Sequence, residues 1–149
     1  MPTLDLPSFL PFRLNRLAAE ISDRLSAIYA ERFDLDIPAW RVLATLDDGE
    51  EWTAQEIVAS TRTHKSTISR AVADLEKRKL VSRVQHEADG RAMTLQLTSR
   101  GRQLMDRLIP LAKSFEAELL STLTSVDRRN LTDGIASLER SLGLSGDKT

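Results

Sequence analysis

Residues 64–80, HKSTISRAVADLEKRKL, are followed closely by the segment EADGR at 87–91 and by the alternating run MTLQL at 93–97. The first stretch predicts an amphipathic helix, because its apolar residues recur at three- and four-residue steps. Those residues are Ile68, Ala71, Val72 and Leu75. The alternating run predicts a strand, and Asp89 with Gly90 favours a turn before it. A helix that leads directly into a hairpin is the order of a recognition helix and a β-wing.

Positive charge is collected in this same part of the chain. Residues 62–102 hold ten Lys or Arg against four Asp or Glu, a net charge of +6, whereas the rest of the chain carries −7 and the whole chain −1. The outward side of the helix contains Lys65, Ser66, Thr67, Ser69 and Arg70. A basic, hydroxyl-rich surface on a nearly neutral protein indicates a nucleic-acid binder. A solvated helix face and ordinary first-turn capping are the alternatives.

Helices are expected before this segment. Apolar residues at helical spacing predict a first helix over residues 12–32, preceded by a proline-containing arm. Pro38 is tolerated in a first helical turn, so residues 39–46 are expected to form a second helix. Thr53, followed by Gln55 and Glu56, favours an N-cap for a third helix that ends near Ala59.

Two more helices are expected after the hairpin. Thr98 opens a long helix in which Pro110 should produce a kink, and Ser125 with Asp127 starts a final helix. Their apolar residues follow alternating four- and three-residue steps; these are Leu104, Leu108, Leu111, Phe115 and Leu119, then Leu131, Ile135, Leu138 and Leu142. Such stripes pack along another helix, within one protomer or between two. The short central lobe offers them little surface, which favours a dimer.

Composition excludes several classes of protein. A length of 149 residues suits one domain with helical extensions, and no apolar run approaches the roughly 20 residues that cross a membrane. The start of the chain lacks a secretory signal, so a cytoplasmic protein is expected. With no cysteine and two histidines, neither a metal site nor a cofactor is expected. A hydrolase, the main rival among enzymes, would need a nucleophile with a base, a G-x-S-x-G elbow or a phosphate-binding glycine loop, and the sequence has none; we expect no enzyme.

The chain resembles the MarR family of winged-helix regulators over essentially its whole length. The resemblance rests on DGR at 89–91 within EADGRAMTLQLTSRGRQL, on the hydroxyl-rich start of the helix at residue 64, and on LEKRKLVSR before the wing. Lys79 stands where many members have glycine. The resemblance implies a mainly α fold with a small β-wing, a winged helix-turn-helix with long N- and C-terminal dimerisation helices. Its parts would be an arm and dimerisation helix at 1–34, a DNA-binding lobe at 35–98 and dimerisation helices at 99–149.

The resemblance also implies how such a protein meets double-stranded DNA. A homodimer would place two recognition helices in successive major grooves of a pseudo-palindrome and two wings in the flanking minor grooves. Arg91 would enter a minor groove, oriented by Asp89. The DNA-contacting residues would be Arg62, Lys65, Ser66, Thr67, Arg70, Arg83, Asp89 and Arg91, with Lys77 adding backbone attraction. For Asp89 and Arg91, a plain exposed turn is the alternative.

A regulator of this family is further expected to bind a small aromatic or phenolic effector between the dimerisation helices and the DNA-binding lobe. The candidate residues are Phe12, Arg13, Arg16, Phe33, Trp40, Arg41, His64 and Phe115. Core packing is the alternative for Trp40 and Phe115, and a solvated or structural role for His64. FRLNRLAAEIS and IPAWRVLA are similar to members that control aromatic-acid catabolism, some of which respond to aromatic acyl-CoA thioesters.

These observations together predict a ligand-responsive transcriptional regulator, a repressor that leaves its operator when an aromatic acid or its CoA thioester binds. A winged-helix module that binds protein and has no affinity for duplex DNA is the alternative function. The basic recognition surface favours DNA.

Overall fold

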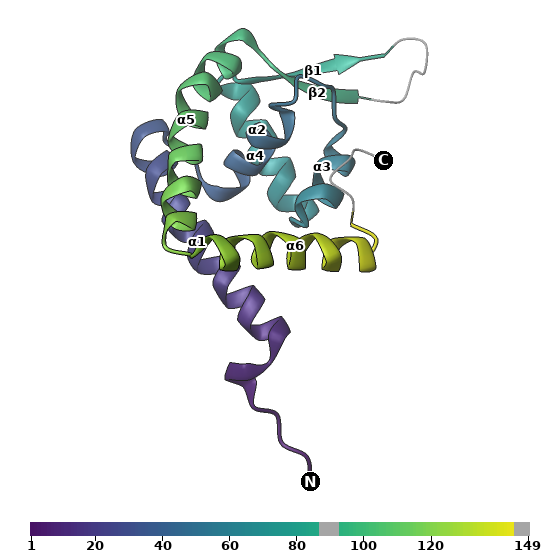
Figure 1. The fold of residues 1–149 in the computed structure, drawn as a ribbon. Coiled ribbons are helices and arrows are strands. Elements are labelled where there is room, and N and C mark those ends of the chain that lie inside the picture. The colour runs from purple at the N-terminus through teal and green to yellow at the C-terminus, as the bar shows by residue number, and fades with distance from the viewer. Residues whose placement is uncertain (87–92, 145–149) are drawn as a thin grey trace.

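Six α-helices and one β-hairpin form the described part of the chain, residues 1–86 and 93–144 of a computed structural model (Figure 1). The elements in chain order are the 3-10 turn η1 (Leu6–Ser8), α1 (Leu10–Phe33), α2 (Ile37–Leu46), α3 (Ala54–Thr61), α4 (Lys65–Lys77), β1 (Val81–Gln85), β2 (Met93–Leu97), α5 (Ser99–Ser121) and α6 (Ser125–Ser141). This mainly helical architecture with a small antiparallel sheet is the winged helix-turn-helix that the sequence predicts.

The ends of the helices follow local chemistry. Asp36 caps α2 by accepting from the Ala39 N–H at 2.9 Å. Thr53 and Glu56 form a reciprocal capping box at α3, as the sequence predicts. Thr98 caps α5, which continues through Pro110 as one helix. Each cap satisfies an N–H group that the first helical turn leaves without an intrahelical acceptor.

The hairpin pairs Val81 with Leu97 at one end and Gln85 with Met93 at the other. Leu95 is 1% exposed and also pairs with Trp52, whose backbone N–H donates to the Leu95 carbonyl at 3.1 Å. The hairpin is therefore held to the helical lobe by backbone hydrogen bonds as well as by apolar contact, which a two-stranded ribbon requires.

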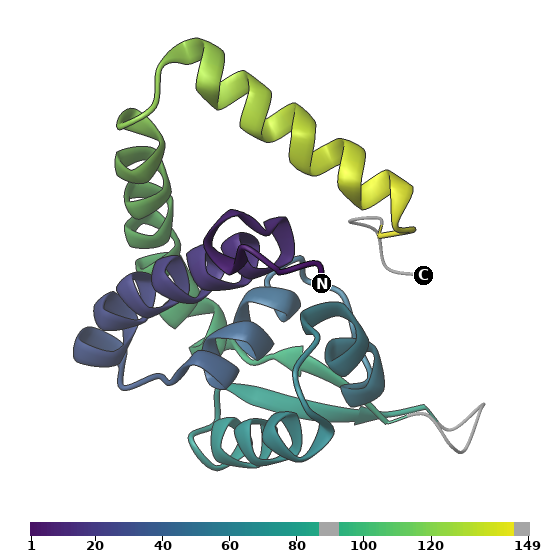
Figure 2. The same ribbon diagram turned by 90° about the horizontal axis from the view of Figure 1, so that it is seen from below.

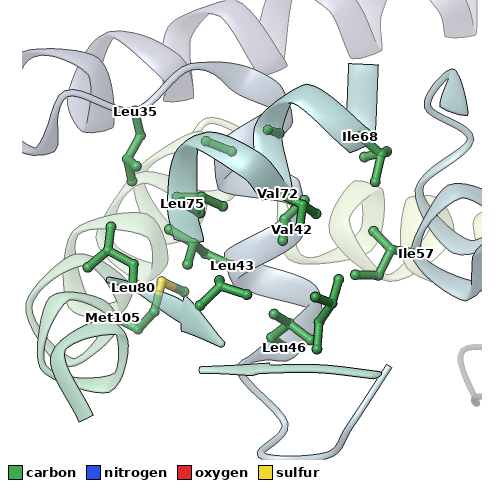
Figure 3. Close-up of a cluster of buried hydrophobic side chains, with 14 of the residues drawn as sticks. Leu35, Val42, Leu43, Leu46, Ile57, Ile68, Val72, Leu75, Leu80 and Met105 are labelled. Carbon is green, nitrogen blue, oxygen red and sulfur yellow. The ribbon is translucent and has the colours of Figure 1, made fainter. Parts of the chain in front are cut away.

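The core lies between α2, α3 and α4, with the start of α5 closing one side (Figure 3). Val42, Leu43 and Leu46 of α2 are completely buried. The four residues predicted as the apolar side of α4 are all buried: Ile68, Ala71, Val72 and Leu75. Each fully buried aliphatic side chain contributes roughly 1.5–3 kcal/mol, so this cluster fixes which side of α4 faces outward.

The two ends of the chain extend beyond this core. The first turns of α1 and the whole of α6 lie on the side away from the hairpin (Figures 1 and 2). No residue of α6 is buried, and in α1 only Tyr29 and Phe33 are. The predicted stripe of α6 is therefore not an intramolecular core. Within the described residues, no helix is long and apolar enough to cross a bilayer.

Candidate nucleic-acid interface and adjoining aromatic site

The outward side of α4 carries the polar residues expected from the sequence. His64 caps the helix: its Nδ1 accepts from the Ser66 N–H at 3.2 Å and lies 2.9 Å from the Ser66 hydroxyl. An open hollow is lined by His64, Lys65, Ser66, Ser69 and Arg70. Neither Lys65 nor Arg70 forms an ion pair with another described residue. Both cations are thus available to an external anion such as a DNA phosphate.

Two neighbouring candidates sit differently. Arg62 ends α3 in the left-handed backbone conformation, with φ 54°, and its side chain is exposed. Thr67 is half-buried, whereas Ser66 and Ser69 are exposed. Thr67 therefore presents less surface to a partner than its neighbours do.

Arg83 on β1 is tied to α4. Its Nε lies 2.8 Å from Oε1 of Glu76, and both side chains are partly exposed. The pair links the wing strand to the end of the recognition helix and neutralises a cation that the sequence assigns to DNA. The other two wing candidates, Asp89 and Arg91, lie outside the described residues.

The base of the hairpin holds a polar cluster that the sequence did not single out. Oε2 of Glu51 lies 2.6 Å from His86 Nε2 and accepts from the Thr94 hydroxyl at 3.0 Å. The cluster joins the loop before α3 to both arms of the hairpin and so sets the angle at which the hairpin leaves the lobe. No local signal could have found it, because its members are 35 and 43 residues apart from Glu51.

An aromatic pair lies where α1 meets α2. The Tyr29 and Trp40 rings stack with centroids 5.4 Å apart and an interplanar angle of 16°. Trp40 also lines an apolar hollow of about 410 Å³ together with Phe115 and with residues of α1 and α5. A hollow of this size is at the lower end of the range for small-molecule sites.

The Tyr29 hydroxyl is the one buried side-chain polar atom in the described residues that lacks a hydrogen-bond partner. Tyr29 is 1% exposed, and this burial raises the pKa of its phenol to about 12, against the lowering effect of the nearby Arg41 cation. Arg41 is half-buried, and its Nη1 donates to the Thr63 hydroxyl at 3.0 Å. A buried polar atom without a partner is uncommon in proteins and calls for a structural or functional explanation.

The remaining effector candidates are divided among separate places. Phe12, Arg13 and Arg16 line a second open hollow at the start of α1, where Arg16 lies 6.0 Å from the centre of the Phe12 ring. Phe33 belongs to the core and is covered by Arg107, whose guanidinium carbon lies 5.3 Å from the ring centre. The structure thus brings Trp40, Arg41 and Phe115 to one region, with Tyr29 as an addition that the sequence listed only as part of an apolar stripe.

Comparison with known proteins identifies relatives of this arrangement. A family model described as MarR family matches residues 33–92. The HTH-type transcriptional repressor IacR of Pseudomonas putida is 26% identical over 127 residues, which are 85% of this chain and 74% of that protein.

Solved structures agree over the whole fold. A MarR family transcriptional regulator from Silicibacter pomeroyi is 28% identical, with a TM-score of 0.79 and coverage of 91% of each chain. BpsR of Bordetella bronchiseptica, whose DNA binding is regulated by 6-hydroxynicotinic acid, is 22% identical, with a TM-score of 0.70 and coverage of 85% of this chain and 98% of that one.

Proposed function

Because this chain belongs to the MarR family of winged-helix transcriptional regulators, we propose that it is a repressor released from DNA by a small aromatic acid or its CoA thioester. It binds a pseudo-palindromic operator as a homodimer. The observation that carries this proposal is the outward side of α4, where two cations without ion pairs and a row of hydroxyl groups stand opposite a completely apolar inner side.

This surface suits duplex DNA better than a protein partner. An α-helix fits the major groove, where hydroxyl and guanidinium groups meet base edges and the ammonium of Lys65 meets phosphate. Lys65 and Arg70 lie more than one helical turn apart on α4, so they reach different phosphates or bases. A protein-binding surface of comparable size would present apolar side chains at its centre, and the outward side of α4 has none in its hollow.

The exposed apolar residues of the terminal helices support the homodimer. They are Leu6, Phe9, Leu10, Leu14 and Leu17 near the start of the chain, and Val126, Leu131, Ile135, Leu138, Leu142 and Leu144 in and after α6. Such stretches are larger than a soluble monomer usually leaves exposed. A second copy of the same chain has the matching stripes, and a twofold axis would pair them with each other.

The region around Trp40 supports an aromatic effector. A ring can stack against Trp40 or enter the apolar hollow beside it, and Arg41 supplies a cation for an acidic group. IacR is named as a repressor, and BpsR has its DNA binding regulated by an aromatic acid. Release requires only that the effector prefer one dimer conformation by about 1–3 kcal/mol.

Fluorescence anisotropy with DNA from immediately upstream of the protein's own gene tests the proposal. The wild type should bind this DNA more tightly than a scrambled duplex, with an affinity that falls as salt rises. The double variant Lys65→Ala with Arg70→Ala should weaken binding and reduce the salt slope by roughly 0.9 for each phosphate contact that is lost. Arg24→Ala, which removes an exposed cation of α1 far along the chain from α4, is the matched control.

Three outcomes contradict parts of the proposal. Equal binding to the scrambled duplex by the wild type would contradict operator recognition by this DNA. An unchanged salt slope in the folded double variant would remove α4 from the interface. Tight operator binding that neither aromatic acids nor their thioesters relieve would leave a repressor without the proposed effector.

A further inference from the structure

The turn between α3 and α4 is held from outside by a single side chain of α2. Thr63 is 8% exposed and lies directly before His64, the residue that caps the recognition helix. Its hydroxyl accepts from Arg41 at 3.0 Å and donates to the Thr61 carbonyl at a longer 3.3 Å. The position of the first turn of α4 therefore depends on where the Arg41 guanidinium lies.

The turn has reason to need such support. Arg62, immediately before Thr63, has a φ of 54°, a conformation that residues other than glycine adopt at a cost. Tertiary contacts must hold a segment of this kind in place. Among the printed contacts of the turn, the Arg41 to Thr63 hydrogen bond is the one that reaches a distant part of the chain, 22 residues away.

Arg41 also faces a second, unfilled demand. No carboxylate among the described residues forms an ion pair with it. The buried Tyr29 hydroxyl, which has no partner, lies within the reach of the Arg41 charge, and the Tyr29 ring stacks on Trp40. A phenol donor and a guanidinium beside an aromatic face are the groups that a carboxylate on an aromatic ring requires.

We propose that Arg41 is a positioning residue shared by two competing partners, the Thr63 hydroxyl and the carboxylate of an aromatic acid bound beside Tyr29 and Trp40. This inference rests on the proposed function. In the DNA-binding state the guanidinium holds Thr63 and, through it, the start of α4. When the acid binds, the guanidinium turns to the carboxylate, because a hydrogen bond between two charged groups is stronger than one to a neutral hydroxyl. The first turn of α4 then loses its support.

The inference selects one effector chemistry from the two in the proposed function. A free acid carries the negative charge that draws Arg41 away from Thr63. In a thioester the same carbon carries an uncharged carbonyl, which attracts a guanidinium less. The effector is therefore the free aromatic acid.

Thr63→Val tests the competition, because it removes the hydroxyl while nearly keeping the shape of the side chain. Losing a hydrogen bond to a charged group should lower operator affinity about tenfold or more. Affinity for the acid should rise by a similar factor, since Arg41 is no longer held by Thr63. Damage to the fold would lower both affinities, so opposite changes identify the competition. Thr61→Val is the matched control: it removes a hydroxyl that bonds only the Ile57 carbonyl of its own helix, and both affinities should stay near wild type.

Arg41→Met provides a second variant that separates the two partners. It should weaken operator binding as Thr63→Val does, but it should lower affinity for the acid. The probes are 6-hydroxynicotinate, 4-hydroxybenzoate and benzoyl-CoA, with operator binding followed by anisotropy and acid binding by calorimetry on the dimer.

The outcomes distinguish this inference from the proposed function. If an acid releases the wild type and Thr63→Val lowers both affinities, or changes neither, the competition at Arg41 is refuted and the repressor stands. If only benzoyl-CoA releases the wild type, the free-acid effector is refuted. If the wild type shows no preference for operator DNA, the proposed function itself fails.

Discussion

Replacing Gly101 with alanine should destabilise the protein strongly, because α5 begins against the backbone of the turn after α4. A Cβ atom at position 101 would lie 2.1 Å from the Leu80 carbonyl oxygen and 3.3 Å from a Leu97 methyl carbon. Ordinary contact needs about 3.4 Å or more, so the two backbones would have to separate by roughly 1.3 Å. A backbone oxygen cannot move aside as a flexible side chain can.

Hydrogen bonds oppose that separation. The Thr98 N–H donates to the Leu80 carbonyl at 3.1 Å, and the Thr98 hydroxyl donates to the Lys79 carbonyl at 2.6 Å. Relief of the clash would stretch these bonds and open the packing around Leu80, which is 3% exposed. Overpacking usually costs 1–3 kcal/mol, and for this rigid contact we expect about 3 kcal/mol or more.

Urea unfolding followed by circular dichroism, at one fixed protein concentration, measures this loss. About 3 kcal/mol is a large part of the roughly 5–15 kcal/mol that stabilises a typical domain, and it would lower Tm by roughly 6–12 °C. Ser99→Ala, on the exposed side of the same turn, is the control and should unfold near wild type. If Gly101→Ala unfolded at the same urea concentration as Ser99→Ala, the close approach of α5 to Leu80 would be wrong.

Three further predictions concern a buried phenol, the wing strand and the terminal helices. Because the pKa of Tyr29 is raised from 10.0 to about 12, the native state keeps a proton that the unfolded chain loses, so wild-type stability should fall between these pH values by about 2–3 kcal/mol relative to Tyr29→Phe; parallel pH curves would contradict this. Glu76→Gln should free Arg83 for phosphate and steepen the salt dependence of DNA binding by up to roughly 0.9, measured by anisotropy; an unchanged slope would place Arg83 away from DNA. Ile135→Asp should convert the dimer to monomers in light scattering, whereas Ser137→Asp, on the opposite side of α6, should not; a dimeric Ile135→Asp variant would exclude this stripe from the interface.

Much of the fold follows from local patterns. The spacing of Ile68, Val72 and Leu75 predicted the buried side of α4, and the capping signal at Thr53 predicted the start of α3; both are confirmed. The left-handed conformation of Lys79, with φ 62°, lies where the family resemblance pointed to glycine. These features depend on residues within one or two helical turns of each other, which a sequence displays directly.

The candidate site was less accessible to the sequence. Arg83 was assigned to DNA from its charge and its place in the wing, yet its ion pair with Glu76 depends on how β1 returns along α4. Phe33 was grouped with the effector residues for its aromatic ring and lies in the core instead. The type of a side chain is a local property, but its partner is chosen by elements that meet through packing.

The sequence by itself determined the order of the elements, the inward and outward sides of α4 and the concentration of positive charge on residues 62–102, because periodicity and charge are written along the chain. Only the tertiary structure decided that Tyr29 is buried without a partner, that Arg41 reaches Thr63 and that α6 stays fully exposed. Each of these depends on distances between segments far apart in the chain. Such distances are set by the burial of the whole core, so no short stretch of sequence contains them.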